Sequence, residues 1–178
     1  MPIAVNLSPR CLLESHLVTD VRDLLSEFAL PANLLRLEVT ETAVMANPAV
    51  ATATLGELHD LGVALSIDDY GTGYSSLAYI KQLAVNELKI DRTFVSGMEA
   101  DSSNAAIVRS TIELGHNLGL TVAAEGVETD HELTVLRRYG CDLAQGYHFS
   151  RPMTAEAFVA WLAKQPGHGG VRLTRVGG

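Results

Sequence analysis

The sequence has few cysteines, few basic residues and no long apolar run, and each shortage disfavours a class of protein. Its only cysteines, Cys11 and Cys141, stand in unrelated contexts, so we expect no disulfide framework and a reducing, cytoplasmic setting. Thirteen lysines and arginines against 21 aspartates and glutamates give a net charge of -8, which disfavours a binder of nucleic acid polymers. No apolar stretch approaches the ~20 residues that span a bilayer, so we expect no membrane contact. The first residues are too few and too soon broken by polar positions to be a signal peptide.

What the sequence does contain is a regular alternation of strand-like and helix-like segments. With 178 residues, 47% of them hydrophobic, the chain suits one domain with a sizeable core, which we place at residues 1–164. The glycine-rich residues 165–178 are predicted to be a flexible tail. Strands separated by helices indicate a parallel sheet. The predicted strands are 3–7, 34–39, 63–69, 87–91, 121–127 and one within 141–150. The predicted helices are 15–29, one opened by Asn47-Pro48, 75–82, 101–119, 131–139 and 154–164.

Residue alternation along these strands predicts where polar groups gather. One set of alternate positions is aliphatic and suits packing against helices, while the other ends in a polar residue near the carboxyl end of each strand. A polar ring at the carboxyl ends of successive parallel strands is typical of a (β/α) barrel, whereas an open doubly wound sheet has two apolar faces. The polar positions are Asn6, Glu38, Asp68, Lys89, Asp91, Glu125 and, from the sixth strand, Gln145.

The stretch Ile67–Ser76, IDDYGTGYSS, allows two chemical interpretations. Gly71 to Ser76 approximates the glycine-rich phosphate loop of dinucleotide-binding folds, and Asp91 follows Gly71 by 20 residues, where a ribose-binding acid is expected. That motif normally opens its fold, however, and here it falls in the third strand–helix unit. The alternative is a metal site, because clustered carboxylates and a carboxamide suit Mg²⁺ or Mn²⁺, and adjacent Asp68 and Asp69 could serve two ions. The metal interpretation accounts for more of the polar ring, and we favour it.

Six long motifs in order resemble the EAL family of bacterial cyclic di-GMP phosphodiesterases. They are NLSP, LEVTET, IDDYGTGYSSL, LKIDRTFV, AEGVET and GCDLAQGYHFSRP. The resemblance implies a TIM-like barrel that hydrolyses cyclic di-GMP to linear pGpG with two Mg²⁺ or Mn²⁺ ions and is inhibited by Ca²⁺. It also implies a homodimer in the complete domain.

The resemblance assigns a role to each matching residue. The first metal is matched by Asn6, Glu38 and Asp68, and the second by Asp68, Asp69 and Glu125. Glu125 is also the candidate general base, Lys89 is matched to a residue that holds water or phosphate, and Asp91 and Gln145 complete the cleft. Glu41 would anchor the loop that contains Gly71, Thr72 and Gly73. Glu128 is either a supporting acid beside the metals or the cap of the next helix.

The resemblance is incomplete at one end, which leaves a second function open. The Glu-Ala-Leu motif is absent, and six of the eight strand–helix units are present, so the match is to the C-terminal three quarters of the domain. We therefore expect little turnover and self-association from this chain alone. The alternative is a silent module that binds cyclic di-GMP or a protein partner, while an enolase-like barrel lacks comparable motifs. Arg36 is predicted to pair with Glu38, and Lys89 could pair structurally with Asp91.

Overall fold

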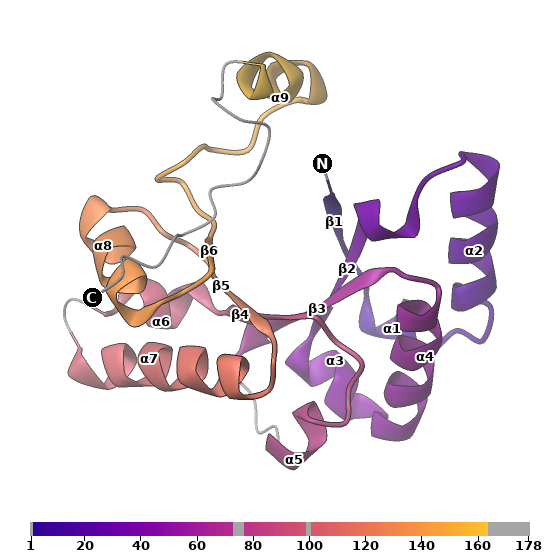
Figure 1. Cartoon of the computed structure of the whole chain (residues 1–178), viewed down its shortest axis with the longest axis horizontal. Coiled ribbons are helices and arrows are strands. Elements are labelled where there is room, and N and C mark those ends of the chain that lie inside the picture. Colours follow the sequence, from indigo (N-terminus) through magenta and orange to yellow (C-terminus); the bar gives the residue numbers. More distant parts are fainter. Residues whose placement is uncertain (1, 73–76, 99–100, 164–178) are drawn as a thin grey trace.

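Six parallel strands, arranged in the order of the sequence, form the centre of the molecule (Figure 1). The computed structural model describes residues 2–72, 77–98 and 101–163, so the predicted tail, 165–178, lies outside the described residues. Within the described part, β1 and β6 each pair with one neighbour only, so the sheet is an open half-barrel. The strands are β1 (Ile3–Asn6), β2 (Leu35–Thr40), β3 (Ala64–Tyr70), β4 (Glu87–Ile90), β5 (Thr121–Ala124) and β6 (Leu143–Ala144).

Helices follow the strands and cover the outer side of the sheet (Figure 1). The region predicted as one helix over 15–29 contains α2, and α1 precedes it. Two helices, α3 and α6, were not predicted, and each begins within one residue of a strand's end. The helices are α1 (Pro9–Leu12), α2 (Leu17–Glu27), the 3-10 turn η1 (Ala32–Leu34), α3 (Glu41–Ala46), α4 (Pro48–Asp60), α5 (Leu77–Ile80), α6 (Arg92–Ser96), α7 (Ser102–Asn117), α8 (Asp130–Tyr139) and α9 (Ala155–Leu162).

Local sequence explains where several helices start and stop. The Asn47 side chain accepts a hydrogen bond from the Val50 amide, and Pro48 occupies the first turn of α4, as the sequence predicted. At α8, Thr129 and Glu132 form a reciprocal capping box, and Gly140 ends the helix with a φ of 80°. These caps fix the points at which the chain leaves each helix to begin the next strand.

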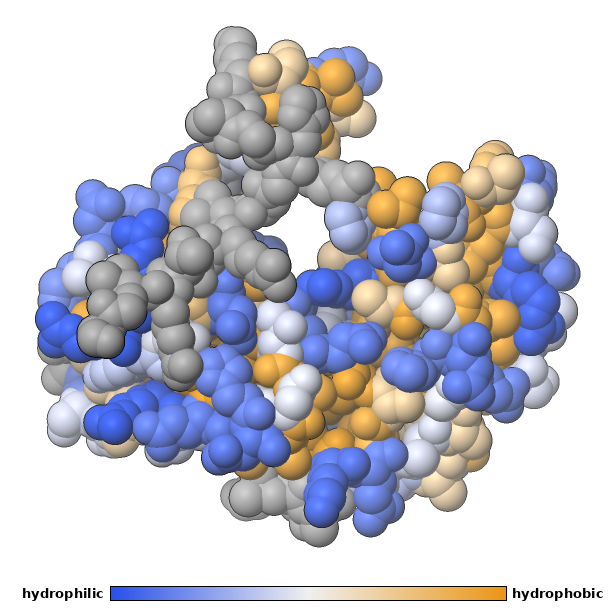
Figure 2. Space-filling model, viewed as in Figure 1, coloured by the Kyte–Doolittle hydropathy of each residue, from blue (hydrophilic) through white to orange (hydrophobic). Residues whose placement is uncertain are grey.

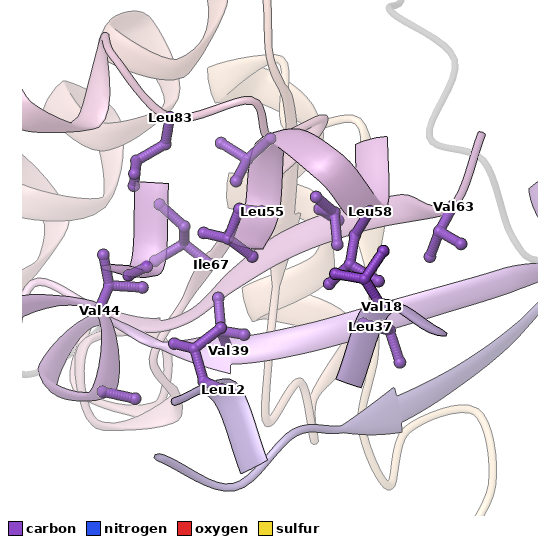
Figure 3. Close-up of a cluster of buried hydrophobic side chains, with 14 of the residues drawn as sticks. Leu12, Val18, Leu37, Val39, Val44, Leu55, Leu58, Val63, Ile67 and Leu83 are labelled. Atoms are coloured by element: carbon purple, nitrogen blue, oxygen red, sulfur yellow. The ribbon is translucent and has the colours of Figure 1, made fainter. Parts of the chain in front are cut away.

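The hydrophobic core lies between the sheet and the helices that cover it. Figure 3 shows Leu37, Val39 and Ile67 of the sheet beside Leu55 and Leu58 of α4. A second cluster joins Ile90 and Val122 to α7 and α8. Because alternate strand residues face opposite sides, filling the outer side with aliphatic groups leaves the polar residues of the same strands on the inner side.

The pairing register staggers these inner residues. Strands of a barrel tilt, so a row of paired residues descends by about one residue per strand, and residues at one height come from alternate strands. One such row is Asn6, Glu38, Ser66, Glu87 and Thr121. From the bottom upward, the inner layers are therefore Arg36 with Glu87; Ala4, Ser66 and Ala123; Glu38 with Lys89; and Asn6, Asp68 and Glu125.

Part of the apolar surface is uncovered. A groove of about 450 Å³ runs beside β1 and α2, where Ile3, Leu24, Phe28 and Leu30 are each more than half exposed. Figure 2 shows apolar residues across the α2 side of the molecule. In Figure 1, α9 stands apart from the rest of the fold, and it contains no buried residue. This exposure is consistent with self-association, which stays a prediction. Among the described helices, none is long and apolar enough to cross a membrane.

Candidate metal centre

The Lys89 side chain lies at the centre of the polar ring. Its Nζ is 2.8 Å from Glu38 Oε2, 3.2 Å from Asp68 Oδ1 and 2.5 Å from Glu125 Oε1. The lysine side chain is only 4% exposed. One buried ammonium thus faces three carboxylates from β2, β3 and the end of β5, and its charge offsets only part of theirs. The alternative pairing with Asp91 is not among the printed contacts of Lys89, whose partners are these three carboxylates.

An irregularity in β3 brings two adjacent aspartates to the same site. Ile67 pairs with Leu88 and Tyr70 with Ile90, so three steps along β3 match two along β4. The extra residue breaks the alternation of faces, and Asp69 adopts a φ of 54°, which is uncommon outside glycine. Oxygen atoms of Asp68, Asp69 and Glu125 consequently lie within 4.8 Å of one another. We refer to these three residues as the carboxylate cluster.

The crowding of negative charge alters the acidities in the cluster. Burial, followed by the charges of Asp68 and Asp91, raises the pKa of Asp69. Burial also raises the pKa of Glu125, although its hydrogen bond with Lys89 opposes the shift. For Lys89, burial favours the neutral amine, but the hydrogen bonds to Glu125 and Glu38 outweigh it and raise its pKa. The site therefore retains a fully charged lysine and carboxyl groups that would gain from an added cation.

Asp91 and Gln145 extend the site on either side of Glu125. Burial opposes ionisation of Asp91, but hydrogen bonds from the Thr93 hydroxyl and amide lower its pKa. Gln145 lines a cavity of about 190 Å³ together with Glu125 and Glu128. Two further residues of this cavity, Arg92 and Tyr147, were missed, although each follows a predicted site residue closely: Arg92 comes directly after Asp91, and Tyr147 comes two residues after Gln145.

The loop after β3 is held by Glu41. Its Oε2 accepts a hydrogen bond from the Gly71 amide at 3.0 Å, and Gly71 has a φ of 99°. Thr72 caps the turn by donating from its hydroxyl to the Asp69 carbonyl. Gly73 lies outside the described residues. Because the Gly71 amide already donates to a carboxylate, it is not free to bind phosphate, which argues further against the dinucleotide-loop interpretation.

Two predicted residues lie at the margin of the cluster. Asn6 is exposed at the end of β1 and is paired in register with Glu38. Glu128 is exposed beside the cavity that Glu125 lines. The cap of α8 is Thr129 and not Glu128, so the capping alternative for Glu128 is wrong.

The predicted pairing of Arg36 with Glu38 is also wrong. Arg36 Nη1 donates instead to Glu87 Oε2, and Glu38 accepts from Lys89. The stagger of the strands explains the difference, because it brings Arg36 level with Glu87 and Glu38 level with Lys89. Strand alternation identified the shared face but not the height of each residue on it.

The residues present fit divalent cations. Three carboxylates with oxygens this close repel one another, and hard oxygen donors are the ligands that Mg²⁺ and Mn²⁺ prefer. Glu38 lies on the opposite side of Lys89, within reach of a neighbouring position. The arrangement can hold cations between β3 and β5 while keeping a lysine beside them.

Comparison with known proteins identifies this architecture. The family model described as the EAL domain matches residues 1–152. The chain belongs to the EAL family. MucR of Pseudomonas aeruginosa, a bifunctional diguanylate cyclase/cyclic di-GMP phosphodiesterase, is 45% identical over 161 residues, which cover 90% of this chain and 24% of MucR. The cyclic di-GMP phosphodiesterase RocR of the same organism is 37% identical over 90% of this chain and 41% of its own length.

Solved structures show the same fold. This EAL domain matches the cyclic di-GMP complex of the MucR phosphodiesterase with a TM-score of 0.86 and 45% identity, over 88% of this chain and 64% of that one. It matches the manganese and cyclic di-GMP complex of Klebsiella pneumoniae BlrP1 with a TM-score of 0.78 and 36% identity, over 85% and 39% of the two chains. The six-stranded half-barrel is thus part of the TIM-like barrel predicted from the sequence. The chain spans about a quarter of MucR.

Proposed function

We propose that this EAL domain hydrolyses cyclic di-GMP to linear pGpG with two Mg²⁺ or Mn²⁺ ions. The observation that carries the proposal is the cluster of Asp68, Asp69 and Glu125 oxygens within 4.8 Å, beside a buried lysine. Relatives named as cyclic di-GMP phosphodiesterases, and a relative solved with manganese and cyclic di-GMP, support the substrate and the ions.

The proposal gives each residue a task. Asp68, Asp69 and Glu125 would hold one ion, and Asn6, Glu38 and Asp68 the other. When bound, such ions stabilise the attacking and leaving oxygens of a phosphoryl displacement. Glu125, whose pKa is raised by burial, is suited to take a proton from the attacking water. Lys89 retains its charge and can orient that water or a phosphate oxygen. Asp91, Gln145 and Glu128 line or support the cleft.

Two further parts of the proposal concern the surroundings of the site. Glu41 would couple the position of the Gly71 loop to the site through the hydrogen bond between them, and in the complete domain to a homodimer. Ca²⁺, with a larger radius and looser coordination, should occupy the carboxylates without supporting turnover. A BlrP1 complex with calcium and cyclic di-GMP is consistent with binding of that ion in the family. A cytoplasmic setting fits a domain that acts on an intracellular nucleotide.

Hydrolysis of cyclic di-GMP tests the proposal directly. The assay separates pGpG from substrate by chromatography, with Mg²⁺, Mn²⁺ or Ca²⁺, for this chain and for a longer one that includes any coding sequence in frame before Met1. Glu125→Gln should lower kcat by about 10²-fold or more, whereas the matched change at exposed Glu113, Glu113→Gln, should not. Turnover that is unaffected by a chelator would refute the metal mechanism. Binding of cyclic di-GMP without turnover in either chain would favour the silent-module alternative.

A further inference from the structure

A second pair of opposite charges lies beneath the candidate site. Arg36 of β2 donates to Glu87 of β4, and the Glu87 side chain is only 2% exposed. Glu87 also interacts electrostatically with Lys89 and Glu38, in the layer above. The inner side of β2 and β4 therefore carries four charges that form one electrostatic group: a lower pair, Arg36–Glu87, and an upper pair, Glu38–Lys89.

These four charges have an alternative arrangement. Arg36 and Glu38 are two residues apart on one face of β2, and Glu87 and Lys89 are related in the same way on β4. Pairing within each strand would draw Glu38 down toward Arg36 and Lys89 down toward Glu87. Both movements would take side chains away from the carboxylate cluster.

The structure favours pairing between strands. Ser66 of β3 lies between the two strands, paired in register with Glu38 on one side and Glu87 on the other, and it is fully buried. A small side chain at this position leaves room for the longer side chains of β2 and β4 to meet over β3. The stagger then sets Arg36 against Glu87 and Glu38 against Lys89.

We propose that Arg36 and Glu87 are positioning residues, which by binding each other keep Glu38 and Lys89 facing one another at the carboxylate cluster. The catalytic consequence rests on the function proposed above. The arrangement of the four side chains does not, and it can be tested separately.

The two single substitutions should have different signatures. In Glu87→Gln, the freed Arg36 guanidinium competes for Glu38, so the Kd for Mn²⁺ should rise by about tenfold or more, as for loss of a group that supports a ligand. In Arg36→Met, the freed Glu87 competes for Lys89, so the side-chain NMR resonance of Lys89 should shift, while the Kd for Mn²⁺ should not rise. The chain has only three lysines, which makes isotope labelling of lysine a direct reporter.

A double variant and an exposed control complete the experiment. Arg36→Met/Glu87→Met removes both competitors and should return the Mn²⁺ affinity and the Lys89 resonance to the values of the natural chain, because a buried ion pair can often be replaced by apolar groups. Glu113→Gln removes the same charge from an exposed pair with Arg109, 3.0 Å apart, and should change neither quantity.

The outcomes separate the proposal from simple electrostatics and from the proposed function. Equal and opposite changes in Mn²⁺ affinity in the two single variants would indicate a long-range field effect and overturn the proposal, as would no change in either variant. If a single variant does not fold, proton–proton contacts of Lys89 in the natural chain decide: contacts to Glu38 support the proposal, and contacts to Glu87 overturn it. Failure of the natural chain to bind Mn²⁺ would count against the proposed function, while the lysine measurements would still test the pairing.

Discussion

Replacing Lys89 by methionine should make the stability of this domain depend on divalent metal. The substitution keeps the apolar stem but removes the ammonium that lies 2.5–3.2 Å from Glu38, Asp68 and Glu125. Removing one partner from a buried ion pair costs about 3–5 kcal/mol, because the remaining charge is left uncompensated. Domains of this kind have only about 5–15 kcal/mol of total stability, so the metal-free variant should be close to unfolding.

Metal should restore much of this loss. A ligand at 100 times its Kd stabilises a folded protein by about 2.7 kcal/mol, and the variant should bind Mn²⁺ more tightly because the lysine no longer competes for the carboxylates. Urea unfolding with and without Mn²⁺ measures both effects, with exposed Lys81→Met as the matched control. If metal-free Lys89→Met unfolds at the same urea concentration as the natural chain, Lys89 does not compensate these carboxylates and the electrostatic account of the site is wrong.

Three further substitutions test other parts of the structure. Glu41→Ala removes the acceptor of the Gly71 amide and should cost about 1–3 kcal/mol in urea unfolding, whereas Glu41→Gln, which keeps an acceptor, should cost less. Leu55→Ala, at a fully buried position of α4, should lower the free energy of unfolding by about 2–5 kcal/mol in the same assay. Gly126→Ala would place a Cβ 2.4 Å from the Arg92 Cβ at a φ of +68°, so it should displace the segment that carries Glu125 and raise the Kd for Mn²⁺ in calorimetry.

Much of the fold could be predicted because strand alternation and helix caps are local signals. The aliphatic positions Leu37, Ile67 and Leu88 are buried on the helix side as their spacing predicted. The Asn47-Pro48 start of α4 was read from two residues. By contrast, α3 and α6 were missed because they are only six and five residues long and follow a strand with almost no intervening loop.

The candidate site was predicted in composition but not in arrangement. The face on which Glu38, Lys89 and Glu125 meet follows from alternation within each strand. Their contacts depend on the stagger between strands, which a single sequence does not encode locally, and the wrong pairing of Arg36 with Glu38 has this cause. The irregularity that turns Asp69 toward the site also arises from the pairing of β3 with β4.

The extra residue in β3 has a consequence for directed evolution of this domain. Asp69 interrupts the ladder with β4 and holds a backbone conformation that costs a non-glycine residue of order 1 kcal/mol or more. Libraries screened for expression or heat resistance alone should therefore accumulate Asp69→Gly or deletion of this residue, both of which remove the carboxylate. Libraries screened for turnover should retain aspartate, so the two selections should diverge first at this position.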